Sequence, residues 1–384
     1  MIKLEKKANC CGCGACAQSC PKNCITMVAD GEGFLYPQVD EAACVNCGLC
    51  EKVCPILTKK KVPDGGVNAY AAYSSDEEIR KVSSSGGMFS VLAREILNRG
   101  GVIAGAAFDE DFSVRHILVE TVEELNRLRG SKYVQSRMED TYIQIRDLLK
   151  QGRVVLFTGV SCQVAGLKAF LGRDYDNLYT VDVLCHGVPS PKVWAKYCRE
   201  QETVHGQKLT GVSFRDKRIS WRKYSLSMKF GNNTEYCRRG GEDAYLQVFL
   251  GDLCLRPSCH SCRFKQFPRM SDLTIGDAWG IEKHNPELDD DRGTSVVLVN
   301  SQKGQGLWDA VAGNVVFRSG ELDALLPKDA DSRRSVKPNP NRSRFFAALD
   351  RGDIIEQLSK LTRKSPMRRL LSWGKRRVKG LLRK

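Results

Sequence analysis

Eight cysteines near the N-terminus follow a spacing that is typical of iron–sulfur ligation. The run C-x2-C-x2-C-x3-C-P occurs twice, from Cys10 to Pro21 and from Cys44 to Pro55. Three thiolates two residues apart can surround one face of a cubane, and the fourth ligates the other cluster in two-cluster ferredoxins. The spacing therefore predicts two [4Fe–4S] clusters. The ligands of one would be Cys10, Cys13, Cys16 and Cys54, and those of the other would be Cys20, Cys44, Cys47 and Cys50.

Zinc is the alternative metal for these eight thiols. A structural zinc site favours four ligands in two C-x2-C pairs, without a proline after a fourth cysteine. Cys11 and Cys24 lie outside the pattern and are expected to be packing residues.

A second set of cysteines is scattered over the middle of the chain. Its members stand in the segments FTGVSCQVAGLK, DVLCHGVPSP and RPSCHSCRF, and they are Cys162, Cys185, Cys259 and Cys262. Together they could hold a third [4Fe–4S] cluster, which is the interpretation we favour. Zinc and unligated thiols remain open, because long-range spacing does not establish that the four converge. Cys254 could substitute as a ligand, and His186 and His260 adjoin candidate ligands.

The 17 cysteines could instead form a disulfide framework. Such frameworks belong mostly to small secreted domains. This chain has 384 residues and begins MIKLEKKANC, without the apolar segment of a secretory signal. It also lacks an apolar run near the roughly 20 residues that a membrane-spanning helix needs. We therefore expect a cytoplasmic protein whose thiols bind metal.

The pattern along the chain predicts an α+β protein. A ferredoxin-like 2[4Fe–4S] domain over residues 1–57 is followed by a charged linker, Thr58 to Gly66. From 67 to 345, apolar strand-like runs alternate with helix-like segments, which favours an α/β flavoprotein body with a mixed sheet. Antiparallel strands are expected over 209–236, and 252–300 is predicted to be rich in loops, with a strand at Ser295–Val299.

A flavin is expected because clusters transfer single electrons, whereas most organic substrates take two. The segment SSSGG opens a predicted helix, where backbone N–H groups and hydroxyls could bind phosphate; a plain helix cap is the alternative. The segment GSKYVQS adds a cation, hydroxyls and an aromatic ring, and a strand-to-helix turn follows near 159. The candidate flavin contacts are Ser84, Ser85, Gly86, Gly87, Ser131, Lys132, Tyr133, Gln135, Ser136, Gly159 and Gln163.

Seven separated blocks carry a resemblance to a known family. In order they are SSSGGMFS, GSKYVQS, FTGVSCQVAGL, CHGVPSPKVW, SFRDK with SWRKYS, LRPSCHSCRF and SDLTIGDAWGI. They resemble the coenzyme F-420 hydrogenase/dehydrogenase beta-subunit family over roughly residues 65–300. The resemblance implies FAD and iron–sulfur clusters, with SSSGG and GSKYVQS as flavin contacts and the four body cysteines as a cluster site. Asp277 and Trp279 would lie near that site.

The expected function is an FAD-dependent iron–sulfur oxidoreductase. It would pass electrons between a ferredoxin or another redox protein and a small-molecule acceptor of two electrons, in either direction. Forms with this fused N-terminal domain are similar to proteins of bacterial polysaccharide biosynthesis. The alternative is an electron-transfer subunit without its own substrate, which docks a catalytic partner. The catalytic residues are unknown.

The C-terminal segment 357–384 is predicted to be a basic amphipathic helix. It carries 11 lysines and arginines and no acidic residue, so it accounts for most of the net charge of +15. Its apolar residues fall on one helical face, as in helices that lie on anionic membrane surfaces. We therefore expect peripheral association with the inner face of the cell membrane, with a solvated basic helix as the alternative. The nearly neutral remainder argues against specific nucleic-acid binding. The apolar positions are Met367, Leu370, Leu371, Val378, Leu381 and Leu382.

Overall fold

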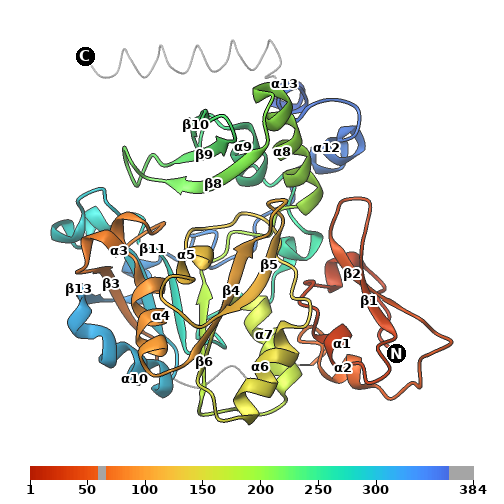
Figure 1. Ribbon diagram of the computed structural model, residues 1–384, viewed down its shortest axis with the longest axis horizontal. Coiled ribbons are helices and arrows are strands. Elements are labelled where there is room, and N and C mark those ends of the chain that lie inside the picture. Colours follow the sequence, from red (N-terminus) through yellow and green to blue (C-terminus); the bar gives the residue numbers. More distant parts are fainter. Residues whose placement is uncertain (59–65, 363–384) are drawn as a thin grey trace.

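A computed structural model describes residues 1–58 and 66–362 (Figure 1). Residues 1–58 form an N-terminal domain in which two short helices each follow a glycine of positive φ, Gly14 at 75° and Gly48 at 73°. Glycine adopts this backbone conformation at little cost, which lets each cysteine loop turn directly into its helix. The segment between the two cysteine runs forms an antiparallel hairpin, with Ile25 opposite Val39. The elements are η1 (Lys7–Asn9), α1 (Ala15–Gln18), β1 (Ile25–Ala29), β2 (Leu35–Val39) and α2 (Leu49–Lys52).

The body is built on an eight-stranded mixed sheet with the order β13-β3-β12-β11-β7-β6-β4-β5. β4, β6, β7 and β11 are parallel neighbours, and β3 runs in the same direction because β12 is antiparallel to both β3 and β11. The carboxyl ends of five strands therefore meet at one edge, where α/β proteins commonly bind ligands. The strands are β3 (Asn68–Ser74), β4 (Val102–Phe108), β5 (Val114–Val119), β6 (Val155–Val160), β7 (Leu178–Val183), β11 (Leu273–Asp277), β12 (Ser295–Val299) and β13 (Val315–Gly320).

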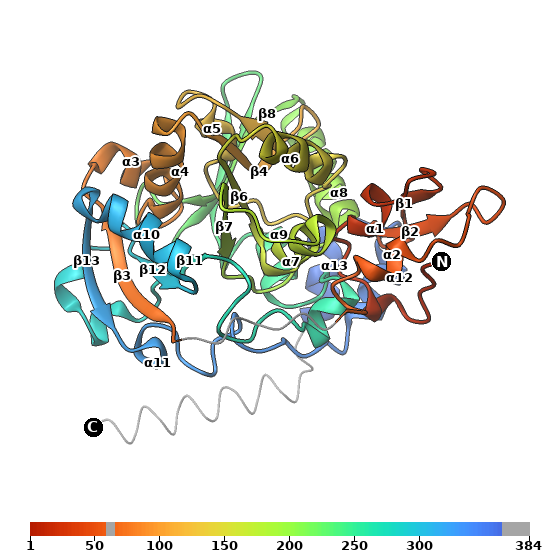
Figure 2. The ribbon, with the colours of Figure 1, turned by 90° about the horizontal axis from the view of Figure 1, so that it is seen from below.

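Helices cover both faces of this sheet. Ile103 of β4 packs in the core beneath α4 and α10, whereas the next residue, Ala104, packs beneath α6 and α7. This alternation follows from the two-residue period of a strand. α1 of the N-terminal domain lies against α7 (Figure 2). The helices of the body up to this point are α3 (Glu77–Lys81), α4 (Met88–Asn98), α5 (Leu125–Leu128), α6 (Thr141–Lys150), α7 (Ser161–Leu171) and α10 (Gln302–Val311).

A three-stranded antiparallel sheet, β10-β9-β8, lies over the carboxyl edge of the large sheet (Figure 1). Phe214 of β8 contacts Phe108 at the end of β4, and Arg215 pairs with Asp277 at the end of β11. The small sheet packs with four helices in a separate core. The strands are β8 (Leu209–Asp216), β9 (Ser225–Phe230) and β10 (Glu235–Arg239), and the helices are α8 (Pro191–His205), α9 (Ala244–Leu250), α12 (Arg342–Ala348) and α13 (Ile354–Thr362). The remaining short elements are η2 (Pro257–Ser261), η3 (Ile281–Lys283), η4 (Pro286–Leu288), η5 (Ala312–Asn314) and α11 (Leu322–Leu325).

The predicted α+β class and mixed sheet are confirmed, and the strand expected at Ser295–Val299 is β12. β11 lies inside the segment that was expected to be rich in loops. Of the predicted tail, residues 357–362 end α13, and residues 363–384 lie outside the described part of the chain. Among the described residues, no helix is both long and apolar enough to cross a membrane.

Trp308 of α10 is expected to be a main contributor to the stability of the body. Its ring stacks on Tyr70 at 4.5 Å and meets Phe317 edge-on at 5.2 Å, with 2% of its surface exposed. Trp308→Ala should lower the free energy of unfolding by about 3–5 kcal/mol, because it leaves a cavity. Ile219→Ala, at a side chain that is 83% exposed, should change it by less than about 0.5 kcal/mol. Equal effects in urea unfolding followed by circular dichroism would contradict this packing.

Candidate electron-transfer site

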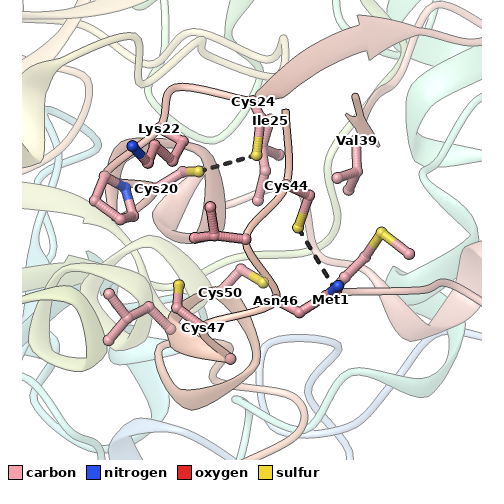
Figure 3. Close-up of a pocket in the computed structure, with 14 residues that line it drawn as sticks. Met1, Cys20, Lys22, Cys24, Ile25, Val39, Cys44, Asn46, Cys47 and Cys50 are labelled. Atoms are coloured by element: carbon pink, nitrogen blue, oxygen red, sulfur yellow. Dashed lines mark hydrogen bonds between the residues drawn. The ribbon is translucent and has the colours of Figure 1, made fainter. Parts of the chain in front are cut away.

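The thiols of Cys20, Cys44, Cys47 and Cys50, here called the distal group, line one pocket of the N-terminal domain (Figure 3). Apolar side chains complete the wall, among them Ile25. This is the ligand set predicted for one cluster. The side chain of Cys47 is exposed, so the group lies near the surface. Electrons could therefore pass between this group and an external carrier.

The thiols of Cys10, Cys13, Cys16 and Cys54, here called the proximal group, are more buried. Cys16 interacts electrostatically with Cys10 and Cys54, and Cys13 interacts with Cys16. Burial raises the pKa of Cys16 to about 12. An apolar surrounding disfavours bare thiolates, and bound iron would supply the compensating positive charge.

The four scattered cysteines of the body also converge. Cys162 is the second residue of α7, Cys185 follows β7, and Cys259 and Cys262 lie in and after η2. Cys162 interacts with Cys185 and Cys262, and Cys259 interacts with the same two thiols. The structure thus brings together the four residues predicted for a third cluster, here called the body group. Burial raises the pKa of Cys185 to about 11 and that of Cys259 to about 12.

The other residues considered beside the body group have different partners. Cys254 is fully buried in the core around α8 and α9. His186 Nε2 lies 2.8 Å from Asp252 Oδ1, and His260 Nδ1 lies 3.1 Å from the carbonyl oxygen of Val336. These contacts engage one ring nitrogen of each imidazole, and His260 Nε2 is buried without a hydrogen-bond partner.

Cys11 joins the proximal group to the body group. Its thiol is within hydrogen-bonding reach of Cys13 and Cys162, and it is buried in the same core as both. The approach depends on Gly166 of α7, where an added Cβ would stand 2.8 Å from Cys13 Cβ and 3.0 Å from Cys13 Sγ. One helix therefore carries a body-group cysteine at its start and contacts a proximal-group cysteine about one turn later.

Buried cations stand beside both of these groups. Lys265, 4% exposed, donates to the carbonyl oxygens of His186, Asp331 and Arg334, and its charge acts on Cys185 and Cys262. Arg256, 0% exposed, donates to the N-terminal domain. Arg256 lies within the segment LRPSCHSCRF and Lys265 directly follows it, but the sequence did not predict that either cation would lie beside a thiol group.

The thiols are not spaced for a single ion. Within residues 1–58 and 66–362, no three His, Cys, Asp or Glu side chains are grouped closely enough to hold one metal ion. A four-iron cubane is larger than one ion, so its four thiolates stand farther apart. The chemistry of three all-cysteine groups fits such clusters.

The two predicted flavin segments meet at the carboxyl edge of the large sheet. Ser84 Oγ accepts hydrogen bonds from Ser131 N at 2.8 Å and Ser131 Oγ at 3.2 Å. Ser85 Oγ donates to the carbonyl oxygen of Thr294 at 3.0 Å, and Gly86 N donates to Ser295 Oγ at 3.0 Å. Ser84 and Ser131 thus hold the two segments together, and Ser85 and Gly86 attach the first segment to the start of β12.

The remaining predicted flavin contacts divide into separate places. Burial lowers the pKa of Lys132 to about 7, and its ammonium donates to the carbonyl oxygens of Leu128 and Arg129. Tyr133 Oη accepts from Arg215 at 3.3 Å. Gln135 instead faces the N-terminal domain through Arg256. The structure therefore does not bring Gln135 together with Ser84.

Ser136 and Gln163 belong to a buried network that includes His116, a residue that the sequence did not single out. Gln163 Nε2 donates to Ser136 Oγ at 2.7 Å, and that oxygen lies 3.0 Å from His116 Nδ1. His116 Nε2 lies 3.0 Å from the carbonyl oxygen of Thr158. Gly159 has no room for a side chain, because an added Cβ would stand 2.9 Å from Gln163 Oε1.

Asp277 and Trp279 lie where β8 crosses the carboxyl edge. Asp277 accepts from Arg215 at 2.6 Å and from Trp221 Nε1 at 3.1 Å. The ring of Trp279, 47% exposed, stacks on Trp221 at 4.5 Å. The edge thus presents an aromatic surface beside a buried ion pair.

Family models match most of the described chain. The N-terminal part of the coenzyme F420 hydrogenase/dehydrogenase beta subunit matches residues 69–141, and its C-terminal part matches 152–324. The chain belongs to this family. A 4Fe–4S dicluster domain matches residues 9–57, so the family body is fused to an iron–sulfur domain, as the cysteine spacing predicted. The protein is therefore an iron–sulfur electron-transfer protein of the oxidoreductase class.

Among solved structures, the chain is similar to one in the F420-reducing [NiFe] hydrogenase complex from Methanosarcina barkeri. The two share 18% sequence identity, with a TM-score of 0.46, over 79% of this chain and 94% of that chain. No curated protein matches the chain.

Gly166→Ala is expected to separate α7 from the N-terminal domain. The added Cβ would overlap Cys13 and come within 2.9 Å of Tyr142 Oη, so the chain should lose about four iron atoms, those of the proximal group. Gly306→Ala is the control, because a Cβ at this helical glycine of α10 meets nothing within 4 Å. Iron assay after anaerobic purification measures both. Full iron content in Gly166→Ala would show that this contact does not position the proximal group.

His116 should make stability depend on pH. Burial lowers its pKa to about 4, whereas the unfolded chain has the ordinary value of about 6.5. As the pH falls below about 6.5, His116 becomes protonated in the unfolded chain. In the folded chain it stays neutral until about pH 4, so the free energy of unfolding falls over this range. Between pH 7 and pH 5 this costs about 2 kcal/mol. His116→Gln should lose less stability over that range in urea unfolding; an unchanged slope would contradict the buried neutral imidazole.

Proposed function

We propose that this chain is an FAD-dependent iron–sulfur oxidoreductase. It passes electrons between a ferredoxin-like carrier and a small organic molecule that takes two electrons. The observation that carries the proposal is the continuous series of thiol groups from the surface inward. The distal group is exposed at Cys47, the proximal group follows, and Cys11 lies between Cys13 and Cys162 of the body group.

The buried charge beside the body group supports a third cluster there. The ammonium of Lys265 contacts only carbonyl oxygens among the partners that the structure gives it. A buried cation needs a nearby negative charge, and a cluster with four thiolates would supply it. The four ligands in this proposal are Cys162, Cys185, Cys259 and Cys262.

The meeting of SSSGG and GSKYVQS at the carboxyl edge supports a flavin site. Ser84 and Ser131 bring the two loops together there, and the first loop leads directly into α4. When bound, flavin would exchange single electrons with iron–sulfur centres and electron pairs with an organic molecule. Trp279 would offer that molecule a flat aromatic surface at the same edge.

The alternative is a subunit that docks a catalytic partner and has no substrate of its own. Two apolar side chains beside the distal group, Val45 at 57% and Leu49 at 38% exposed, favour a protein contact at this surface. Such a contact would serve either a soluble donor or a permanent partner. The place in polysaccharide biosynthesis and the membrane contact of the tail rest on the sequence alone.

Anaerobic purification with iron, sulfide and flavin quantified together tests the proposal. Three clusters and one flavin predict about 12 iron atoms and one FAD per chain. About 8 iron atoms and no flavin would contradict the flavoenzyme and leave the electron-transfer subunit.

Matched cysteine variants test the distal group within the same assay. Cys47→Ser should remove about four iron atoms, because it takes one ligand from that group. Cys237→Ser, at another exposed thiol, in β10, should remove none. Equal iron content in the two variants would contradict the assignment of the distal group.

A further inference from the structure

Arg256 differs from the other buried arginines of the described chain in its partners. Arg80 pairs with Asp290, Arg215 with Asp277, and Arg269 with Asp182. Arg256 is 0% exposed, yet no carboxylate of residues 1–58 or 66–362 lies within ion-pair distance of it. A buried charge without a counter-charge is strongly unfavourable.

The guanidinium instead reaches into the N-terminal domain. Arg256 Nε donates to the carbonyl oxygen of Cys10 at 2.9 Å, and Nη1 donates to Gln135 Oε1 at 3.0 Å. Nη2 donates to the carbonyl oxygen of Leu35 at 2.9 Å and lies 3.5 Å from Cys10 Sγ. The ring of Tyr36 lies 4.2 Å from the guanidinium carbon. Of these partners, the sulfur of Cys10 is the one that becomes an anion when it binds iron.

We propose that Arg256 is the counter-charge of the proximal cluster and raises the reduction potential of that cluster. The inference rests on the cluster ligands of the proposed function. Four thiolates and a cubane core together carry negative charge, which grows when the cluster takes one electron from a one-electron carrier that is thereby oxidised. A fixed positive charge beside Cys10 favours the reduced state.

The same residue links the proximal cluster to the body group. The carbonyl oxygen of Arg256 accepts from Cys259 N at 2.9 Å, and its own N–H donates to the carbonyl oxygen of Val188 at 2.9 Å. Val188 N in turn donates to Cys259 Sγ at 3.3 Å. The charge that favours reduction of the proximal cluster therefore lies next to the loop that carries Cys259 of the body group.

Arg342 provides a matched control. It also joins the body to the N-terminal domain, but it pairs with both carboxylate oxygens of Glu32, so its charge is already balanced. Arg342→Gln removes a second arginine of the same interface without removing an uncompensated charge.

The test is a redox titration of the full, cluster-loaded chain, followed by electron paramagnetic resonance. In Arg256→Gln, one of the one-electron waves should move to more negative potential by at least a tenfold change in the reduction equilibrium, about 59 mV. The other waves should stay in place. Arg256→Lys should keep the wild-type wave, since it keeps the charge. Arg342→Gln should shift the waves less than Arg256→Gln does, because the carboxylate that it leaves unpaired, Glu32, is partly exposed to solvent.

Unchanged waves in Arg256→Gln, or the same shift in Arg342→Gln, would overturn the inference. If Arg256→Gln loses the proximal cluster, Arg256→Lys decides: full iron with the wild-type wave supports the charge, and loss of iron overturns it. A wild-type chain without clusters would overturn the ligand assignments as well, whereas loaded clusters that ignore Arg256 would overturn this inference alone.

Discussion

The N-terminal domain and the body approach each other closely at several glycines, among them Gly12 and Gly166, where a side chain would meet the opposite surface. A Cβ on Gly12 would stand 2.5 Å from Gln135 Nε2 and 2.8 Å from Arg256 Nη1. A Cβ on Gly166 would overlap Cys13. Close packing of this kind fixes the separation of the proximal and body groups, because neither side can shift without a clash. The order of the thiol groups follows from this contact.

The large sheet positions the body group and the candidate flavin loops. Its five parallel strands end at one edge, so segments far apart in the sequence deliver Ser84, Cys162, Cys185 and Asp277 to the same side of the body. The small antiparallel sheet crosses that edge and is held there by Arg215 and Asp277. The body therefore places its thiols and its candidate flavin loops along one edge, with the N-terminal domain against α7.

Local spacing was enough to predict the two cysteine runs, because ligand loops of a ferredoxin are contiguous in sequence. It also predicted most elements of the body. It failed for β11, whose strand conformation depends on pairing with β7 and β12 rather than on a strong local pattern. It could not assign Cys11, which was expected only to pack, because its contact with Cys162 exists only once the N-terminal domain docks. The role of Arg256 could not be predicted either, because its guanidinium contacts Cys10 and Leu35 only in the docked N-terminal domain.

In the proposed electron path, electrons pass between the N-terminal domain and a bound flavin by way of the body group. Rapid anaerobic mixing with a reduced one-electron carrier, followed at iron–sulfur and flavin wavelengths, tests it most directly in the wild type and in Cys185→Ser. In the wild type the clusters should bleach first and the flavin next, whereas the variant should reduce the N-terminal clusters but not the flavin. Flavin reduction at the wild-type rate in Cys185→Ser would contradict it.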